Sequence, residues 1–298
     1  MDIRTALESF QGAWPSIQPA LSTVFGALVA NLFLKSNTSK EEIERLKQAK
    51  FSEIADRLLE DGHITHLEYY KCRNFNKIAQ KADDVYRKQN APRESHSSDT
   101  TFTLDWFVRF FEDAGNISDE QMQELWAKVL AGEIDHPGTF SLRALDVLRN
   151  LSREEAEILQ TLGAYAFTIA DTPYICINED LKSQYNYSHK LFAMYDCGFI
   201  ENNIASHYDV PVENGTAVLR AGSYIAITHC QTPGKLSIDM QRFTKIGKEF
   251  LRFATPDNEY ILSFFNLLKQ SNPTLSLSAH RIVQESGDTF TYEVDSII

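Results

Sequence analysis

The sequence predicts a mainly helical α+β protein, with an N-terminal helical hairpin, a central helical domain and a C-terminal winged-helix-like module with β-hairpins. Three observations predict this fold class. Capping signals precede apolar residues at helical spacing between residues 104 and 170. A linker rich in Ser and Thr separates that block from the N-terminal region. Beyond residue 171, short apolar runs alternate with turn signals such as Asn214-Gly215.

Composition and charge place the chain among folded proteins. It has 298 residues, of which 43% are hydrophobic, and its 29 basic and 41 acidic residues give a net charge of -12. This length suggests about two domains of roughly 100–200 residues each. An acidic chain is poorly suited to nonspecific nucleic-acid binding, because that binding needs many Lys and Arg side chains.

Cysteine usage predicts the compartment. The four cysteines form no Cys-x-x-Cys pair, and the first residues lack the basic and apolar segments of a secretory signal. These features predict a cytoplasmic location and reduced, buried thiols. No complete set of His and Cys residues has the spacing of metal ligands, so we expect no metal and no other cofactor.

The N-terminal region contains a long uncharged stretch, residues 16–34. Within it, residues 20–34 suit one helix of about 22 Å, shorter than the hydrocarbon core of a bilayer at about 30 Å. Ser22, Gly26 and Ala30 recur at four-residue spacing, which lets two helices approach closely. Two alternatives follow: a buried or self-associating helix, which would give a homo-oligomer, or a membrane contact through residues 16–34.

Helical signals continue up to residue 89. Ser39 and Glu42 have capping-box spacing, Asp61-Gly62 marks a break, and a second helix is predicted from about residue 65. Breaks of this kind define the predicted organisation: an N-terminal helical region at 1–90, a linker at 91–103, a helical core domain at 104–170, a winged-helix-like module at 171–255, and a final helix with a β-hairpin at 256–298.

The central block carries the clearest helix signals. Gly115 is predicted to end a helix over residues 105–114, and Ser118 to cap the next helix. Ser152 and Glu155 form a capping box that opens a further helix.

The module that follows is predicted as a winged helix. Residues 181–185 and 188–196 resemble its two helices, and residues 208–228 would supply its wing. The ending Thr244-x-x-Gly247 is similar to the strand-to-helix ending of many winged helices.

The candidate functional residues gather in one segment: Trp126, Gly132, Glu133, His136, Pro137, Gly138 and Arg143. We expect this segment to be a structural corner between two helices, in which a Glu133–Arg143 ion pair pins the turn and Gly138 supplies backbone freedom. The alternative is a ligand or partner site at Glu133, His136 and Arg143.

Two runs of this segment, ELWAKVLAGE at 124–133 and PGTFSLRAL at 137–145, resemble the LWAxxLAGE…PGxFSLRxL core of a bacterial family built on a domain of unknown function. The similarity covers roughly residues 100–255, and Ala144 stands where that family has Thr. The resemblance implies a setting of mobile elements and phage defence, and it transfers no catalytic residue.

Motifs of known chemistry are absent from the sequence. It contains no phosphate-binding glycine loop, no Gly-x-Ser-x-Gly and no His-Glu-x-x-His, so we expect no enzyme activity. The predicted recognition helix offers only His189 and Lys190 as cationic groups, which argues against nucleic-acid binding.

The sequence therefore predicts a non-enzymatic bacterial anti-phage defence or stress-response protein that acts as a sensor or adaptor through protein–protein contacts. Its partner would be a phage protein or the product of a neighbouring gene. A first alternative is a membrane-acting abortive-infection effector that uses the apolar N-terminal helix. A second is a DNA-binding winged-helix regulator.

Overall fold

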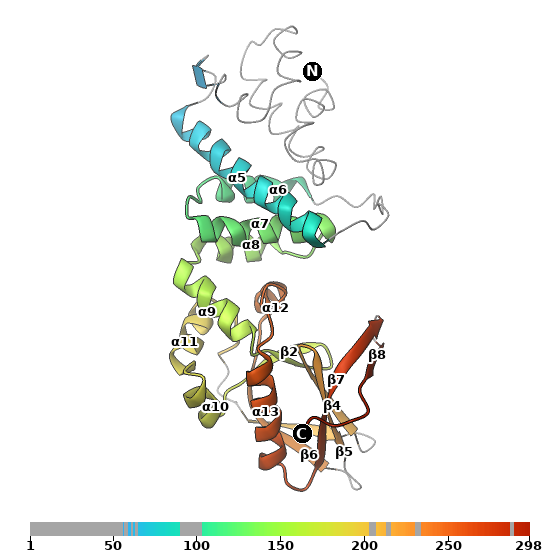
Figure 1. Ribbon diagram of the computed structural model, residues 1–298. Coiled ribbons are helices and arrows are strands. Elements are labelled where there is room, and N and C mark those ends of the chain that lie inside the picture. Colours follow the sequence, from blue (N-terminus) through green and yellow to red (C-terminus); the bar gives the residue numbers. More distant parts are fainter. Residues whose placement is uncertain are drawn as a thin grey trace. The chain divides into compact units, whose positions relative to one another are not determined.

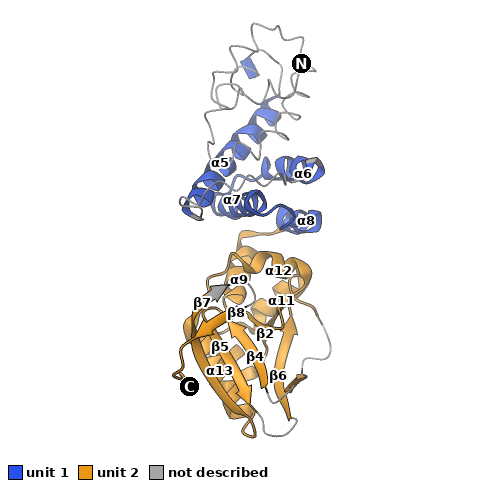
Figure 2. Cartoon of the chain, turned by 90° about the vertical axis from the view of Figure 1, so that its right-hand side faces the viewer, with its two compact units in different colours: residues 1–150 blue, residues 151–298 orange. Residues whose placement is uncertain are grey.

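The computed structural model describes residues 65–89, 103–202, 207–212, 216–229, 234–286 and 289–298, together with residues 56, 59, 60 and 62. Contacts along the chain divide it into two compact units, residues 1–150 and 151–298, which Figure 2 colours separately. The predicted apolar helix and the Ser39 capping box lie outside the described residues.

The described part of the first unit is helical. Its helices are α5 (His66–Gln89), α6 (Leu104–Ala114), α7 (Glu120–Asp135) and α8 (Leu142–Asn150). Helix α5 packs against α7 and α6. Aromatic rings fill the space between them: Phe75 meets Phe107 edge-to-face with ring centroids 6.0 Å apart, and Phe110 lies 5.2 Å from Trp126. Such buried aromatic pairs supply much of a small core's stability.

The second unit combines helices with one antiparallel sheet. Its helices are α9 (Arg153–Gly163), α10 (Glu179–Gln184), α11 (Ser188–Asp196), α12 (Lys245–Leu251) and α13 (Asn258–Ser271). Its strands are β1 (Phe167–Ile169), β2 (Thr172–Cys176), β3 (His207–Val212), β4 (Thr216–Ala221), β5 (Tyr224–His229), β6 (Gly234–Arg242), β7 (Ser276–Ser286) and β8 (Thr289–Tyr292). The strand order is β3-β6-β2-β1-β4-β5-β7-β8.

Helix α13 lies against one face of this sheet (Figure 1). Its Phe264 ring is 4.5 Å from that of Phe167 on β1, and its Tyr260 ring stacks 4.0 Å from that of Tyr165. Asn272, directly after the helix, accepts a hydrogen bond from Ser237 N at 2.9 Å. One part of the unit's core therefore lies between α13 and the sheet, and another part contains Phe199 and Phe250, whose ring centroids are 5.4 Å apart.

The expected fold class, mainly helical with a winged-helix module, is wrong. The described chain is a sheet-rich α+β fold, because the segments expected to form a wing are β3, β4 and β5 of an eight-stranded antiparallel sheet. Strand β6 is the strand expected before Thr244, and it joins β3 to β2 through pairs such as Cys176↔Met240, which the sequence pattern does not predict. Such pairing links residues far apart in the chain and leaves no local sequence signal.

In the described chain, two-residue turns connect β1 to β2 and β4 to β5. Between β1 and β2 the turn residues are Ala170 and Asp171, with φ of 46° and 61°. A tight hairpin turn of this kind requires positive φ at both positions, which normally favours Asn-Gly. An L-residue such as alanine is strained there by roughly 1–2 kcal/mol.

Candidate functional site

The predicted helical corner is held by one buried carboxylate. Glu133 lies in the last turn of α7 and is 2% exposed. Its Oε1 accepts a hydrogen bond from Gly138 N at 2.7 Å, and its Oε2 accepts one from Phe140 N at 2.9 Å. A charged acceptor of two backbone N–H groups forms strong hydrogen bonds, so the carboxylate fixes the turn that follows the helix.

The turn after α7 has the backbone conformation that Pro137 and Gly138 favour. Thr139 N donates to His136 O at 3.2 Å, which places Pro137 and Gly138 at the two central positions. Gly138 has φ of +87°, a value that glycine adopts without strain. On the far side of the turn, Trp106 Nε1 donates to Phe140 O at 2.8 Å. The corner is thus tied to both α7 and α6.

The other residues predicted for this site divide into buried and exposed groups. Trp126 is fully buried in the aromatic core, and no hydrogen-bond partner for its Nε1 lies among the described residues. Gly132 is inside α7, where its carbonyl accepts from His136 N at 3.0 Å. The exposed His136 ring lies 2.9 Å from the neighbouring Asp135 carboxylate.

The expected Glu133–Arg143 ion pair is wrong. Within the described chain, the Glu133 carboxylate binds backbone N–H groups of the turn, whereas Arg143 is exposed on α8. The physical reason is that a buried turn must satisfy its own N–H groups, and Glu133 is the nearest acceptor. The three residues of the alternative partner site, Glu133, His136 and Arg143, therefore do not share one exposed surface.

The small-residue stripe of Ser22, Gly26 and Ala30, and with it the predicted membrane contact at 16–34, lies outside the described residues. Among the helices that the structure does describe, none has both the length and the apolarity to cross a bilayer.

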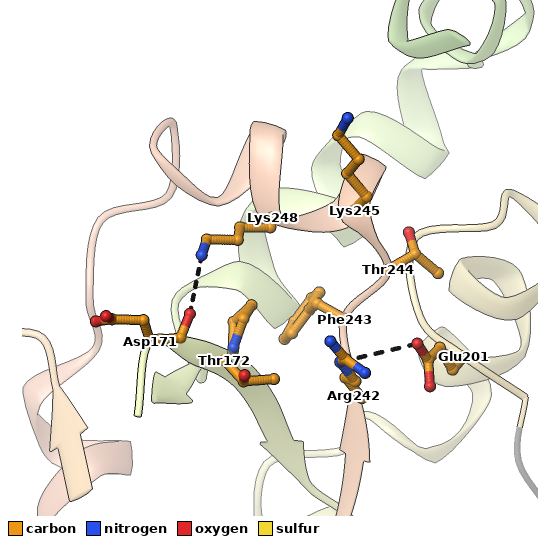
Figure 3. A pocket seen from close by; sticks show the side chains of 9 residues that line it. Asp171, Thr172, Glu201, Arg242, Phe243, Thr244, Lys245 and Lys248 are labelled. Atoms are coloured by element: carbon orange, nitrogen blue, oxygen red, sulfur yellow. Dashed lines mark hydrogen bonds and ion pairs between the residues drawn. The ribbon is translucent and has the colours of Figure 1, made fainter. Parts of the chain in front are cut away.

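A second candidate site is a cavity of about 210 Å³ in the sheet unit, which we name the cationic cleft (Figure 3). Charged residues lining it are Asp171, Glu201, Arg242, Lys245 and Lys248, and Thr172, Pro173, Phe243 and Thr244 complete the lining. They come from the β1–β2 turn, the segment after α11, the end of β6 and the start of α12.

Charges in the cationic cleft are loosely paired. Lys248 Nζ donates to the backbone oxygen of Asp171 at 2.9 Å, so in this contact the ammonium group is paired with a neutral carbonyl and not with a carboxylate. Arg242 Nε lies 3.8 Å from Glu201 Oε1, beyond hydrogen-bond distance. Lys245 extends from the start of α12 without reaching either carboxylate in Figure 3.

Local hydrogen bonds fix the backbone that carries these cations. Thr244 Oγ1 caps α12 by accepting from Gly247 N at 3.1 Å, and it donates to Gly198 O at 2.6 Å. A Cβ on Gly247 would clash with the backbone oxygen of Phe199, so only glycine allows this close approach. The Thr-x-x-Gly sequence therefore docks α12 onto the segment that follows α11.

Sequence reasoning missed the cationic cleft. Its signal would have been the three cations Arg242, Lys245 and Lys248 at three-residue spacing, but their relation to Glu201 depends on the Ile200↔Phe243 bridge. Elsewhere in the described chain, no group of three or more His, Cys, Asp and Glu residues is arranged to hold a metal ion.

Fold and site together define an α+β protein with a carboxylate-locked helical corner and a cationic cleft beside an antiparallel sheet. The chain belongs to the family described as protein of unknown function (DUF2806), which matches residues 63–268. This range includes both the corner and the cleft. Comparison with curated proteins and with solved structures found no match.

Proposed function

We propose that this protein is a non-enzymatic sensor or adaptor in bacterial anti-phage defence or stress response, and that it acts by binding a partner protein. The observation that carries the proposal is an exposed apolar edge of the sheet unit. Its residues, which we name the C-terminal apolar edge, are Val283, Tyr292, Val294 and Ile297, exposed by 67%, 41%, 91% and 42%.

Backbone hydrogen bonds hold this edge in place. Glu293 N donates to Arg281 O at 2.9 Å, and Ile297 N donates to Ala279 O at 2.7 Å, so the tail after β8 runs beside β7. Large apolar side chains on a fixed backbone, gathered within one short segment, are typical of a surface that binds another protein.

The opposite edge of the sheet is protected against pairing. Strand β3 contains Pro211, which cannot donate a ladder hydrogen bond. It also carries Asp209, which accepts from Lys235 Nζ at 3.3 Å, and His207, whose ring lies 2.8 Å from Asp239. Charges and proline are the usual protection of an edge strand. The C-terminal edge has no proline, and its two acidic residues, Glu293 and Asp295, flank the most exposed apolar side chain, that of Val294.

The partners of the Glu133 carboxylate and the residue types in the cationic cleft support the non-enzymatic part of the proposal. The buried carboxylate of the most specific motif, Glu133, is engaged by the backbone of its own turn. Of the described residues that line the cationic cleft, none is Ser, Cys or His. The use of the Glu133 carboxylate within its own turn supports a structural role for the corner.

A phage challenge tests the proposal. Cells that express the protein together with its neighbouring genes should show at least about tenfold fewer plaques for one or more phages than cells without it. Val294→Lys should abolish this protection, because it places a charge at the centre of the apolar contact. Val218→Lys, at an exposed position on β4 away from the edge, is the matched control and should retain protection.

Unchanged plaque counts with the wild-type protein across a broad phage panel would contradict the proposed defence role. Equal protection by the wild type and Val294→Lys would contradict the assignment of the partner surface.

A further inference from the structure

We propose that the cationic cleft binds a dianionic phosphate group, either as free phosphate or as part of a small phosphorylated molecule. This inference concerns a small ligand and a surface other than the C-terminal apolar edge. It therefore goes beyond the proposed function and does not depend on it.

Charge at the cleft favours a dianion. Arg242, Lys245 and Lys248 border the cavity, and Glu201 is the carboxylate that faces Arg242. Asp171 offers its backbone oxygen to Lys248, while Figure 3 shows its carboxylate turned away from the other cations. The lining thus holds three cations and two carboxylates, of which only that of Glu201 faces a cation, so a net positive charge remains for a phosphate monoester, whose charge is about -1.5 to -2 at pH 7.

Unused hydrogen-bond donors point to the same ligand. The Arg242 guanidinium has five donors, yet its Nε is 3.8 Å from the nearest Glu201 oxygen. Lys248 uses one of its three donors on the Asp171 carbonyl. Lys245 makes no ion pair with any described residue. Arg and Lys donors of this kind bind phosphate oxygens through charge-assisted hydrogen bonds.

The cleft is also built on a fixed frame. Arg242 ends β6 and pairs with Tyr174 of β2, whereas Lys245 and Lys248 lie on α12, which Thr244 and Gly247 dock onto residues 198–199. A cation set on such a frame needs little reordering when the ligand binds. The cavity of about 210 Å³ leaves room for a phosphate group and a neighbouring part of its carrier.

Isothermal titration calorimetry on the full-length chain at low salt tests the inference, with inorganic phosphate, ribose 5-phosphate and acetate as probes. Both phosphate compounds should bind with one site per chain, and acetate should bind much more weakly. Tighter binding of ribose 5-phosphate identifies a phosphorylated molecule as the ligand class, and equal binding identifies phosphate itself.

Four variants locate the site. Arg242→Ala, Lys245→Ala and Lys248→Ala should each weaken phosphate binding about tenfold, the usual effect of losing one charge-assisted hydrogen bond. Glu201→Gln should strengthen binding, because it removes the carboxylate that competes for Arg242. Lys245 has no ion-pair partner in the described chain, so its replacement leaves the fold intact and tests binding alone.

The matched control is Lys269→Ala, which removes an exposed cation at the end of α13 and should leave the Kd unchanged. Three results would overturn the inference: no saturable heat with either phosphate compound, equal affinity for acetate, or the same loss of affinity in Lys269→Ala as in Lys245→Ala.

Discussion

The buried carboxylate of Glu133 accepts hydrogen bonds from Gly138 N at 2.7 Å and from Phe140 N at 2.9 Å. At the scale of single residues, this explains why an acidic residue is placed at the end of a helix, where the helix dipole disfavours it. The free energy gained from two charge-assisted hydrogen bonds outweighs that penalty.

Replacing Glu133 by Gln should lower the free energy of unfolding by about 1–3 kcal/mol, because the amide nitrogen would face one of the two buried N–H donors and leave it unpaired. Guanidinium unfolding followed by tryptophan fluorescence measures this, since Trp106 and Trp126 both lie in the same unit. The control Glu124→Gln, on the same helix, removes only an exposed 3.5 Å ion pair with Lys81 and should cost at most about 0.5 kcal/mol. Equal stability of the two variants would contradict the role of Glu133.

Burial also affects the three cysteines in the described part of the chain, Cys72, Cys176 and Cys197. Burial raises the pKa of Cys72 to about 11 and the pKa of Cys176 to about 12. Burial, aided by a hydrogen bond with Glu155, raises the pKa of Cys197 to about 12. Since the thiolate is the reactive form, these thiols react slowly near pH 7.

Iodoacetamide at pH 7.5 should therefore alkylate these three cysteines of the native protein more than about a hundredfold more slowly than a free cysteine with a pKa of about 8.5. Peptide mass spectrometry reads out each position, and the protein unfolded in guanidinium is the control in which all positions react. Rapid labelling of Cys72 in the native protein would contradict this.

At the scale of elements, the β1–β2 turn contains backbone strain at Ala170. The strain becomes evident only when the pairing of β1 with β2 places Ala170 at a turn position with positive φ. Ala170 has φ of 46°, a conformation that glycine adopts freely. Its neighbour Asp171 has φ of 61° and presents its carbonyl to Lys248 at the rim of the cationic cleft. The turn thus links the β1–β2 hairpin to α12.

Ala170→Gly should raise the free energy of unfolding by about 0.5–1 kcal/mol, because relief of left-handed strain exceeds the added entropy of the unfolded chain. Thermal unfolding provides the measurement. The same substitution at Ala193, inside α11, should lower stability by about 1 kcal/mol. A lower melting temperature for Ala170→Gly than for the wild type would show that the turn is not strained.

Local signals in the sequence locate several helix ends closely. The Ser152–Glu155 capping box is present with both hydrogen bonds. The cap of α7 is Asp119, one residue after the predicted Ser118, because the Asp119 carboxylate reaches Met122 N at 2.9 Å. Gly115 ends α6 with φ of -60°, so it serves close packing against Lys71 and not a left-handed cap.

The sheet and the cationic cleft could not be predicted in the same way. Capping boxes act over three residues, whereas the pair Tyr174↔Arg242 joins β2 to β6 across a long stretch of chain. Without that pairing, Arg242, Lys245 and Glu201 have no reason to be considered together. The corner at Glu133 was located from the sequence, but its hydrogen-bond partners came from the structure.

At the scale of the whole molecule, the described residues of the two units carry different features. The first contains the helical corner, whose polar groups stabilise its own turn. The second contains the cationic cleft and the C-terminal apolar edge. The edge follows residue 268, where the family match ends, so the proposed partner surface lies beyond the part of the chain that defines the family.

The central claim is that the protein acts through partner binding at the C-terminal apolar edge, and site-specific photo-crosslinking tests it most directly. Benzoylphenylalanine at position 294 should give an infection-dependent covalent product with one phage protein or one neighbouring gene product. The same residue at position 218 should give none. Equal or absent crosslinking at the two positions, in cells that the protein protects from phage, would contradict the claim.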